Sequence, residues 1–258
     1  MTVTILSDHT RKYWQYEYEV STRYMVPLLA LWGVQVRDAS LIDVGCGEGG
    51  GVCAMHDAGA RCVGFDLDQG RVNAAATLSE NRQIKFTVGN LYEDQIPFQE
   101  QIFDIVVLHD VFEHLEQKDR VIAKLKRFMK PHGVLLITFP PYYSAYGAHQ
   151  QHCAAWFARL PFFHLIPFSI SHLLPRLRGE HASVVTEIKK LARLKMGMRK
   201  FERIVSDSGV QILHKRAYLI SPNHIRFGLR PTPAGLLTEI PLLNEIICSG
   251  VVYLLANK

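Results

Sequence analysis

A glycine-rich segment with acidic residues beside it is the part of the sequence best suited to chemistry. Five of the seven residues 45–51 are glycine, and the segment directly follows an apolar run that contains Asp43. Glycine lets a ligand approach the backbone closely, because it has no side chain and adopts conformations that other residues avoid. Asp66 ends the next apolar run, where a carboxylate can accept hydrogen bonds from ribose hydroxyls. Together these residues indicate a site for a nucleotide-containing ligand.

The glycine spacing is compatible with more than one such ligand. Gly45, Gly47 and Gly50 satisfy the GxGxxG pattern of dinucleotide-binding proteins. A short glycine pattern is weak evidence when it stands alone. A nicotinamide or flavin dinucleotide therefore stays open as an alternative at this point.

Residues that can move protons gather in two further places. His109 and Asp110 follow a long apolar run, and His149 and His152 follow an aromatic stretch. Imidazole titrates near neutral pH, so each histidine is a candidate general base. The alternatives are a backbone role for His109 and ordinary packing for the other two. The spacing of His149, His152 and Asp110 has no metal-ligand signature, and we predict no metal site.

The hydrophobic pattern predicts alternating strands and helices over residues 38–140. This alternation is typical of a parallel sheet covered by helices. Asp43, Asp66 and His109 then stand near the carboxyl ends of strands, the edge at which open α/β sheets bind ligands. The predicted strands are 40–44, 61–65, 84–88, 103–108 and 134–139, with Pro131 to Gly133 as a stop before the last, and the predicted helices are 52–58, 70–80 and 118–129.

The pattern changes after Pro140. Residues 141–181 are rich in aromatic residues, histidine and proline, and are followed by a predicted helix at 184–208 with a basic face. Strands are predicted at 210–220 and 250–255. We therefore predict one sheet domain with two insertions. The core comprises 1–140, 198–221 and 249–258, and the insertions comprise 141–197 and 222–248.

The composition is that of a folded chain. Its 258 residues are 48% hydrophobic and 21% charged with a net charge of +5, which argues against disorder. Five cysteines without CxxC spacing argue against a disulfide framework or a zinc ribbon. No apolar run is long enough for a spanning helix, and the N-terminus lacks the apolar core of a signal peptide. We predict a cytoplasmic location, with membrane association as an option.

Five stretches closely resemble the class I S-adenosylmethionine-dependent methyltransferases, in the methyltransferase type 11 branch that includes small-molecule enzymes of the ubiquinone-biosynthesis type. The resemblance implies a Rossmann-like, doubly wound α/β sheet of seven strands, the last antiparallel and inserted beside the sixth. It also implies a helical lid insertion after strand five and a second insertion before the last strand. The stretches are DVGCGEG at 43–49, GFDLD at 64–68, GNL at 89–91, FDIVVLHDVFEHL at 103–115 and LKRFMKPHGVLL at 125–136.

The resemblance implies S-adenosyl-L-methionine as the cofactor and assigns roles to individual residues. Asp43 would orient the glycine loop and the amino group of the cofactor, and Asp66 would accept both ribose hydroxyls. The side chains at 67, 90 and 91 would contact the adenine. The implied cofactor contacts are Asp43, Gly45, Cys46, Gly47, Asp66, Leu67, Asn90, Leu91 and His109.

The predicted reaction is methyl transfer to a small or lipid-like acceptor, with oxygen methylation favoured. Open alternatives are carbon methylation of an isoprenoid or quinone-like acceptor, methylation of RNA or protein, and a cofactor-binding subunit without turnover. Glu113 and His114 are expected to start a helix and to pack rather than to act in chemistry. The predicted catalytic residues are His109, Asp110 and His149, and the predicted acceptor contacts are Tyr142, Tyr143, His149 and His152.

An apolar segment at 156–178 precedes the basic helix. It fits a cap over a hydrophobic acceptor, a peripheral membrane contact beside anionic lipid, or a homodimer surface. Nucleic acid is not an expected partner, because the basic residues of 189–203 lie on one helix without exposed aromatic residues between them.

Overall fold

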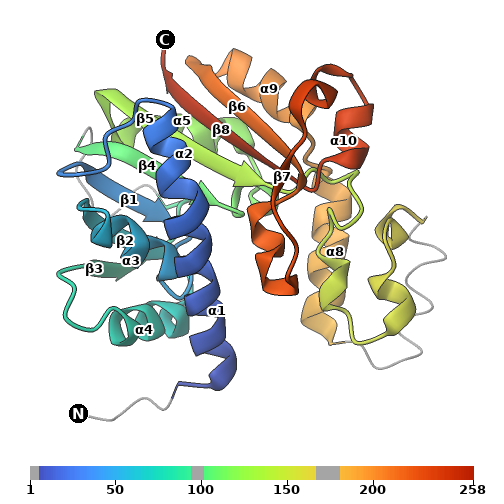
Figure 1. Cartoon of the computed structure of the whole chain (residues 1–258), viewed down its shortest axis with the longest axis horizontal. Helices are drawn as coiled ribbons and strands as arrows, with labels where there is room; N and C mark the ends of the chain where they lie inside the picture. Colours follow the sequence, from blue (N-terminus) through green and yellow to red (C-terminus); the bar gives the residue numbers. More distant parts are fainter. Residues whose placement is uncertain (1–5, 94–101, 167–180) are drawn as a thin grey trace.

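The computed structural model describes residues 6–93, 102–166 and 181–258, and these build an eight-stranded sheet with helices on both faces (Figure 1). The strand order is β3-β2-β1-β4-β5-β8-β6-β7. Strands β1 to β5 pair in parallel, whereas β8 runs antiparallel to both β5 and β6. The strands are β1 Ser40–Val44, β2 Arg61–Asp66, β3 Lys85–Val88, β4 Phe103–His109, β5 Met129–Phe139, β6 Val210–Ile220, β7 Thr232–Pro233 and β8 Gly250–Asn257.

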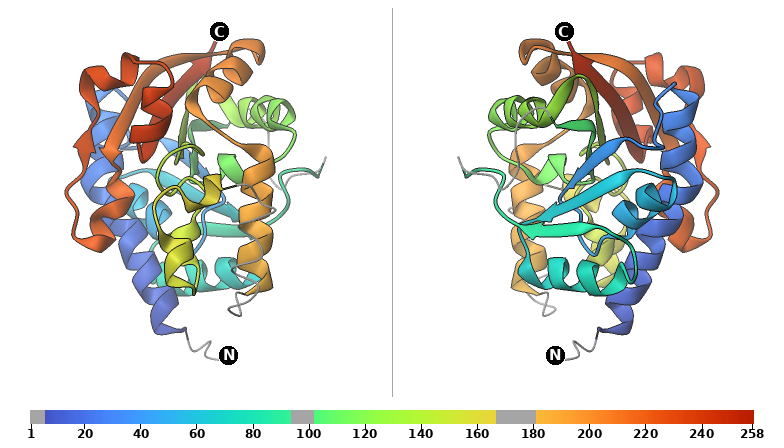
Figure 2. Two further views of the ribbon diagram at one scale, coloured as in Figure 1. Left: turned by 90° about the vertical axis from the view of Figure 1, so that its right-hand side faces the viewer. Right: turned by 90° about the vertical axis from the view of Figure 1, so that its left-hand side faces the viewer.

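Figure 2 shows the sheet between two layers of helices, with the N-terminal helices on one side and α5 and α9 on the other. The helices are α1 Asp8–Val20, α2 Val26–Leu31, α3 Gly50–Asp57, α4 Gln69–Leu78, α5 Lys118–Phe128, α8 Ala182–Leu194, α9 Met198–Asp207 and α10 Leu243–Ile247, with a π-helical turn η1 at Ser21–Met25. The 3₁₀ turns are η2 Phe112–His114, η3 Gln150–His152, η4 Trp156–Arg159, η5 Phe163–Leu165, η6 Pro222–Phe227 and η7 Gly235–Glu239.

Each face of the sheet has its own apolar core. On the α5 and α9 side, the rings of Phe201 and Tyr253 lie 4.5 Å apart and Phe112 meets Phe201 edge-on at 5.2 Å. On the other side, Leu29 and Leu41 are completely buried among the N-terminal helices. The central strands are apolar on both faces for this reason, as parallel strands covered on two sides must be.

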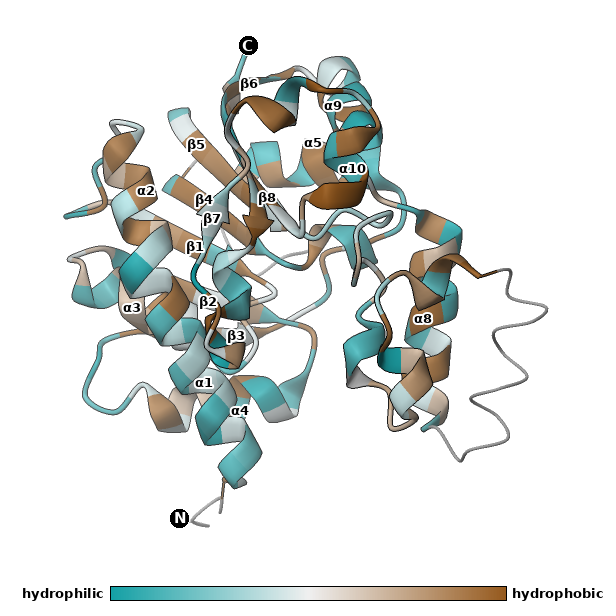
Figure 3. Cartoon of the chain, turned by 45° about the vertical axis from the view of Figure 1, so that its right-hand side comes forward, coloured by the Kyte–Doolittle hydropathy of each residue, from teal (hydrophilic) through white to brown (hydrophobic). Residues whose placement is uncertain are grey.

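Residues 141–166 and α8 form a layer of their own beside the sheet, at the right of Figure 1 and nearest the viewer in the left panel of Figure 2. We call residues 141–166 with α8 the lid. Tyr142 packs against Ala148 and Leu191, so the first residues of the lid are held against α8. Apolar and polar residues are interspersed along α8 (Figure 3). The contacts of Tyr142 and Ala148 with Leu191 thus anchor the lid segment to an apolar face of α8 rather than to the sheet core.

Most of the predicted strands and helices are present within two residues of their expected ends. The prediction for β5 is wrong at its start, because the strand begins at Met129 and not at Val134. The predicted stop at Pro131 to Gly133 lies inside this strand. There the pairing of β5 with β4 shifts register. The first part of the strand is therefore irregular and can accommodate the proline and the glycine.

Two further predictions need correction. The sheet has eight strands rather than seven, because Thr232–Pro233 adds a short edge strand to β6. The helix predicted at 184–208 is two helices, since Lys195 takes a left-handed conformation with φ of 44° that ends α8. The last strand does run antiparallel between β5 and β6, as predicted.

Two predictions about the chain as a whole are consistent with the structure. All five cysteines are buried free thiols. Across the three described ranges, every helix is too short or too polar to cross a membrane.

A buried carboxylate fixes the start of α9. Glu245 of α10 is 6% exposed and accepts hydrogen bonds from the backbone N–H groups of Met198, at 3.0 Å, and Arg199, at 2.8 Å. These N–H groups have no partner within the helix, so Glu245 acts as the N-terminal cap of α9 from a distant part of the chain.

We expect Glu245→Ala to lower the free energy of unfolding by about 2 kcal/mol, because two buried N–H groups lose a charged acceptor. Denaturant unfolding of the purified chain measures the change. Glu239→Ala, at an exposed position of η7, is the control and should change the free energy by less than about 0.5 kcal/mol. Equal stability of the two variants would contradict this role of Glu245.

Candidate active site

A cavity of about 720 Å³ lies at the edge of the sheet where β1, β2 and β4 end. The glycine loop and the ends of these strands form its floor. Tyr16 and Glu17 of α1 line one side, and His149 of the lid and Asn223 of η6 line others. One cavity therefore joins the sheet edge to the lid and to the segment before β8.

The glycine loop turns sharply from β1 into α3. Gly45 has φ of 82°, a conformation that side-chain-bearing residues rarely adopt. A Cβ at this position would lie 2.4 Å from Cγ2 of Val111, so the site has no room for a larger residue. The prediction that glycine is needed at this turn is explained by its dihedral angle and by this close packing.

Asp66, at the end of β2, ties the glycine loop to the sheet. Its Oδ2 accepts a hydrogen bond from the N–H of Gly47 at 2.9 Å, and its Oδ1 accepts one from the N–H of Asp68 at 2.9 Å. Each carboxylate oxygen can accept more than one hydrogen bond. The side chain is 8% exposed and lines the cavity, so both oxygens stay available to hydroxyl groups of a ligand.

Asp43 is the most unusual acid of the site. Its side chain is 7% exposed, and among the described residues none bonds to its Oδ1. Burial raises the pKa of this carboxyl to about 7, against the opposing effect of His109 and with a further increase from Asp66. A buried acceptor without a partner is costly, so the geometry suits a cationic group of a ligand.

Glu17 is a third acid of the site, partly buried, and the sequence did not single it out. It reaches from α1 to the loop, where its Oε2 accepts a hydrogen bond from the N–H of Gly50 at 3.3 Å. Burial raises its pKa well above the ordinary value, and the nearby carboxylates of Glu48 and Asp43 add to this. Only the packing of α1 on α3 brings it here, so sequence spacing carried no signal for it.

A polar network crosses the cavity beside the end of β4. Asp110 has φ of 54°, which turns its carboxylate toward β5, where Oδ1 accepts a hydrogen bond from Thr138 Oγ1 at 2.8 Å. The side-chain amide of Asn223 donates to Oδ2 of Asp110, and its oxygen lies 3.3 Å from His109 Nε2. Asp110 is therefore fixed by Thr138 and Asn223, and Asn223 also contacts the imidazole of His109.

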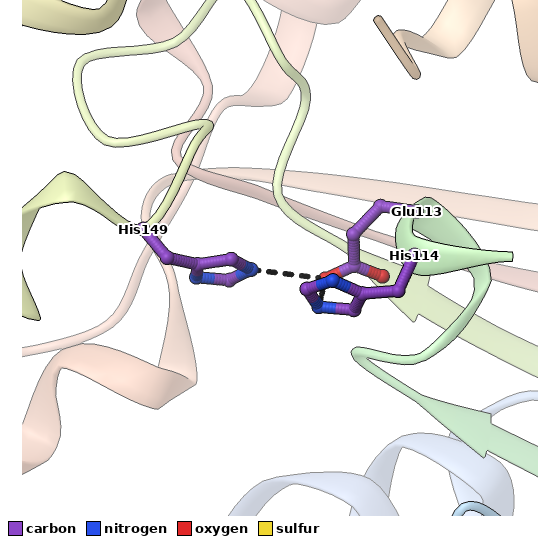
Figure 4. Close-up of side chains that lie close together, drawn as sticks. All are labelled: Glu113, His114 and His149. Carbon is purple, nitrogen blue, oxygen red and sulfur yellow. Dashed lines mark hydrogen bonds and ion pairs between the residues drawn. The ribbon is translucent and has the colours of Figure 1, made fainter. Parts of the chain in front are cut away.

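A second group of titratable side chains lies at the lid side of the cavity (Figure 4). Glu113 is 2% exposed, and its Oε1 lies 3.3 Å from His149 Nε2 and 3.4 Å from His114 Nε2. The other ring nitrogen of His114, Nδ1, contacts a carboxylate oxygen of Glu187 on α8. Side chains from η2, α8 and the segment 141–166 thus meet in this cluster. It contains His149, one of the predicted catalytic residues, and also Glu113 and His114, which were expected only to start a helix and to pack.

The charges in this cluster stabilise one another. Burial lowers the pKa of His114, but the carboxylates of Glu113 and Glu187 outweigh it and raise the value to about 10. Burial would raise the pKa of Glu113, but His114 and His149 outweigh it and hold that pKa well below the ordinary range. The Lys118 ammonium donates to the carbonyls of Phe112 and Leu115, which fixes the turn that carries the two residues.

Of the other predicted cofactor contacts, Cys46, Leu67, Asn90 and Leu91 line the cavity, whereas Gly47 is outside the set of described residues that line it. Leu67 is 68% exposed, whereas Leu91 is 7% exposed. The side-chain oxygen of Asn90 accepts a hydrogen bond from the N–H of Tyr92 at 3.0 Å, so part of its capacity serves the local turn. Cys46 is buried beneath the loop, with Sγ 3.9 Å from the carbonyl of Gly47.

The predicted acceptor contacts divide into two groups. His149 lines the cavity, while Tyr142 and Tyr143 are outside the set of described residues that line it. Tyr142 is buried inside the lid, edge-on to both Tyr143 and His164. The side chain of His152 and residues 167–180, which include much of the predicted apolar segment, lie outside what the structure describes.

Comparison with known proteins finds methyltransferases that are similar to parts of this chain. A family model described as "Methyltransferase domain" matches residues 42–137. An "uncharacterized methyltransferase" of Mycolicibacterium gilvum is 29% identical over 47% of each chain. Another from Mycobacterium avium is 24% identical over 86% of this chain and 79% of its own. The match to the first relative thus spans less than half of its length.

Solved structures show the same fold. An S-adenosylmethionine-dependent methyltransferase from Mesorhizobium loti matches with a TM-score of 0.56 and 17% identity, over 92% of this chain and 99% of its own. At this identity the likeness concerns the fold. It spans nearly the whole chain, including parts outside residues 42–137.

We expect Asp43→Asn to stabilise the ligand-free protein more at about pH 8 than at about pH 5. The pKa of Asp43 is about 7 in the folded protein, above the ordinary value of 3.8. Retention of this proton therefore stabilises the folded wild-type protein in full below pH 3.8, and the stabilisation is lost as the pH rises through 7. The variant does not suffer this loss, and its advantage in free energy of unfolding should grow by about 2–3 kcal/mol between the two pH values. Asp38→Asn, at an exposed position, is the control, and parallel pH profiles for both variants would contradict the assignment.

Proposed function

We propose that this chain, an S-adenosylmethionine-dependent enzyme whose residues 42–137 form a methyltransferase domain, transfers the methyl group to a small or lipid-like acceptor, with oxygen as the favoured nucleophile. The observation that carries the proposal is the single cavity that joins the two buried acids of the sheet edge to His149 of the lid. The cofactor supplies an electrophilic methyl group on a sulfonium. What the chain must do is hold both reactants in line and exclude water.

The residues at the sheet edge fit this cofactor. Asp66 offers two carboxylate oxygens to ribose hydroxyls, while its own bonds to the loop keep them in place. Asp43 offers a buried, unpaired oxygen to the cationic amino group. Leu91 and Leu67 present apolar surface on the same side as Asp66, where the adenine would lie. The ribose, the amino group and the adenine of the cofactor would thus each meet a side chain of matching chemistry at the sheet edge.

The acceptor would enter from the lid side. His109 stands close enough to Asp43 to lower the pKa of that carboxyl, so we place it beside the cofactor. His149 lies in the cluster with Glu113 and His114, and both histidines of the cluster line the cavity. We therefore propose that removal of the acceptor's proton depends on this cluster. A hydroxyl acceptor needs such help to lose its proton, and a carbon nucleophile of the quinone type needs the same help in the same place.

The lid and the segment before β8 would act as the acceptor-binding parts, corresponding to 141–197 and 222–248. Trp156, Leu160 and Phe162 expose 70%, 48% and 39% of their surface on the lid. Such exposed apolar side chains favour a hydrophobic acceptor or a peripheral contact with a membrane that supplies it. A second copy of the chain covering this surface is the alternative, and sedimentation of the purified protein separates the two.

The function is tested by incubating the protein with methyl-labelled S-adenosylmethionine and fractionated cell extracts. Label in a small-molecule or lipid fraction is the expected result. Label confined to RNA or protein would favour the macromolecular alternative. Cofactor binding without transfer to any fraction would favour a binding subunit. Binding of a nicotinamide dinucleotide in place of S-adenosylmethionine would overturn the proposal entirely.

Asp66→Asn should weaken the binding of S-adenosylmethionine by about 30- to 100-fold. The amide keeps the size of the side chain but loses the charge and one acceptor, and hydrogen bonds to charged groups contribute about 1.5–3 kcal/mol. Calorimetric titration measures the affinity. The control is Asp68→Asn in the same loop, whose exposed side chain caps α4 at the N–H of Arg71. Wild-type affinity in Asp66→Asn would exclude the ribose role.

His149→Asn should lower turnover by about 10²- to 10⁴-fold, the usual contribution of a positioned acid or base, while cofactor affinity stays within about twofold. His132→Asn, on the exposed start of β5, is the matched control. Single-turnover assays with the acceptor found above give the rate. If the two variants turn over equally, His149 has no part in the reaction.

A further inference from the structure

The cluster at the lid side of the cavity has the composition and spacing of a metal site. Within the described parts of the chain, ligand atoms of Glu113, His114 and His149 lie within 4.8 Å of one another. Figure 4 shows the imidazole of His149, from the lid, directed at the carboxylate of Glu113. The imidazole of His114, which lies on the same turn η2 as Glu113, is beside that carboxylate. Two histidines and one carboxylate are a recurrent ligand set for zinc and other divalent transition metals.

The distances favour ligands around an ion over direct hydrogen bonds. Glu113 Oε1 is 3.3 Å from His149 Nε2 and 3.4 Å from His114 Nε2. Charge-assisted hydrogen bonds are shorter, at about 2.7–2.9 Å. Ligands that each lie about 2.0–2.1 Å from a tetrahedral zinc ion are separated by about 3.3–3.4 Å. The carboxylate oxygen is therefore already spaced from each of the two imidazole nitrogens as two ligands of such a site are, and the ligand atoms of all three residues lie within 4.8 Å of one another.

The surroundings orient the ligands. His114 directs Nδ1 at a carboxylate oxygen of Glu187, which leaves Nε2 facing Glu113. A carboxylate behind a histidine ligand is the usual means of fixing its tautomer at metal sites. Lys118 holds the turn of Glu113 and His114 through the carbonyls of Phe112 and Leu115.

A separate observation points to a missing ligand. Oε2 of Glu113 is buried in a side chain that is 2% exposed, and none of the described residues bonds to it. A buried carboxylate oxygen without a partner is unfavourable unless a cation completes its surroundings. A metal ion bound at this carboxylate would supply that charge, and it would replace the contacts of Glu113 Oε1 with the imidazole nitrogens of His114 and His149.

We propose that Glu113, His114 and His149 bind one divalent transition-metal ion of the zinc class, with Glu187 as a positioning residue behind His114. His114, His149 and Glu187 line the cavity, so the remaining coordination position faces the acceptor. Three protein ligands and one open position are typical of catalytic rather than structural zinc sites. An acceptor with an oxygen donor would complete the coordination, and this last statement alone rests on the proposed function.

The test uses the full-length chain after removal of metals with a chelator. Co²⁺ is the spectroscopic probe, and Zn²⁺ is then titrated in competition. The wild-type protein should give the intense visible absorption of tetrahedral Co²⁺ at one ion per chain, and Zn²⁺ should abolish it. Mg²⁺ should not compete, because it prefers oxygen ligands in octahedral geometry. A wild-type chain without this absorption, or with Mg²⁺ as an equal competitor, would overturn the proposal.

Variants separate a metal site from a cluster of ion pairs. Glu113→Gln and His149→Asn should each weaken Zn²⁺ by more than 100-fold, and Glu187→Gln by about 10- to 100-fold. His132→Asn should bind as the wild type does. Affinity for S-adenosylmethionine, measured on the same samples, reports whether each variant is folded. Unchanged Zn²⁺ affinity in folded Glu113→Gln or His149→Asn would refute the site, whether or not methyl transfer is observed.

Discussion

Two buried carboxylates at the ends of neighbouring parallel strands are the constraint on which the site depends. Asp43 and Asp66 are each less than one-tenth exposed, yet they differ in how they are satisfied. Asp66 accepts a hydrogen bond from the N–H of Gly47, which holds the glycine loop on β2, and another from the N–H of Asp68. Asp43 has an unpaired oxygen and a raised pKa, so its charge is stable only beside a cation. One acid therefore builds the loop, and the other is complete only with a ligand.

The antiparallel end of the sheet serves the same cavity from the opposite direction. Strand β8 pairs with β5 and carries β6 outward, which places η6 above the end of β4. From η6, Asn223 bonds to Asp110 and approaches His109, and its carbonyl accepts the Tyr16 hydroxyl of α1 at 2.8 Å. This one residue links the N-terminal helix, the central strand and the second insertion. Cavity shape consequently depends on contacts between segments that are distant in the sequence.

The sequence predicted what depends on local pattern. Apolar runs located the strands, and the acids at their ends were found because parallel strands finish at a common edge. Asn223, Glu17 and the partners of His149 were missed, since their roles come only from tertiary packing. Asp110 was identified, but its left-handed backbone, which directs it to Thr138, is not encoded in a recognisable pattern. Likewise β5 begins early, despite a proline and a glycine there, because Phe103 of β4 pairs with Met129 and the side-chain amide of Asn257 donates to the carbonyls of Lys130 and Pro131.

Both ends of the cavity lack a positive charge, and they differ in the groups that surround the unpaired carboxylate oxygen. At the sheet edge, the carboxyl groups of Asp43, Asp66 and Glu17 surround a backbone loop, which suits a cofactor that carries positive charge. At the lid, Glu113 is enclosed by two imidazoles, and an anionic oxygen still has no partner. Nearby, Lys118 is held on backbone carbonyls, and burial lowers its pKa to about 8. Its charge is thus occupied with the turn, so a bound cation remains the group that would satisfy Glu113.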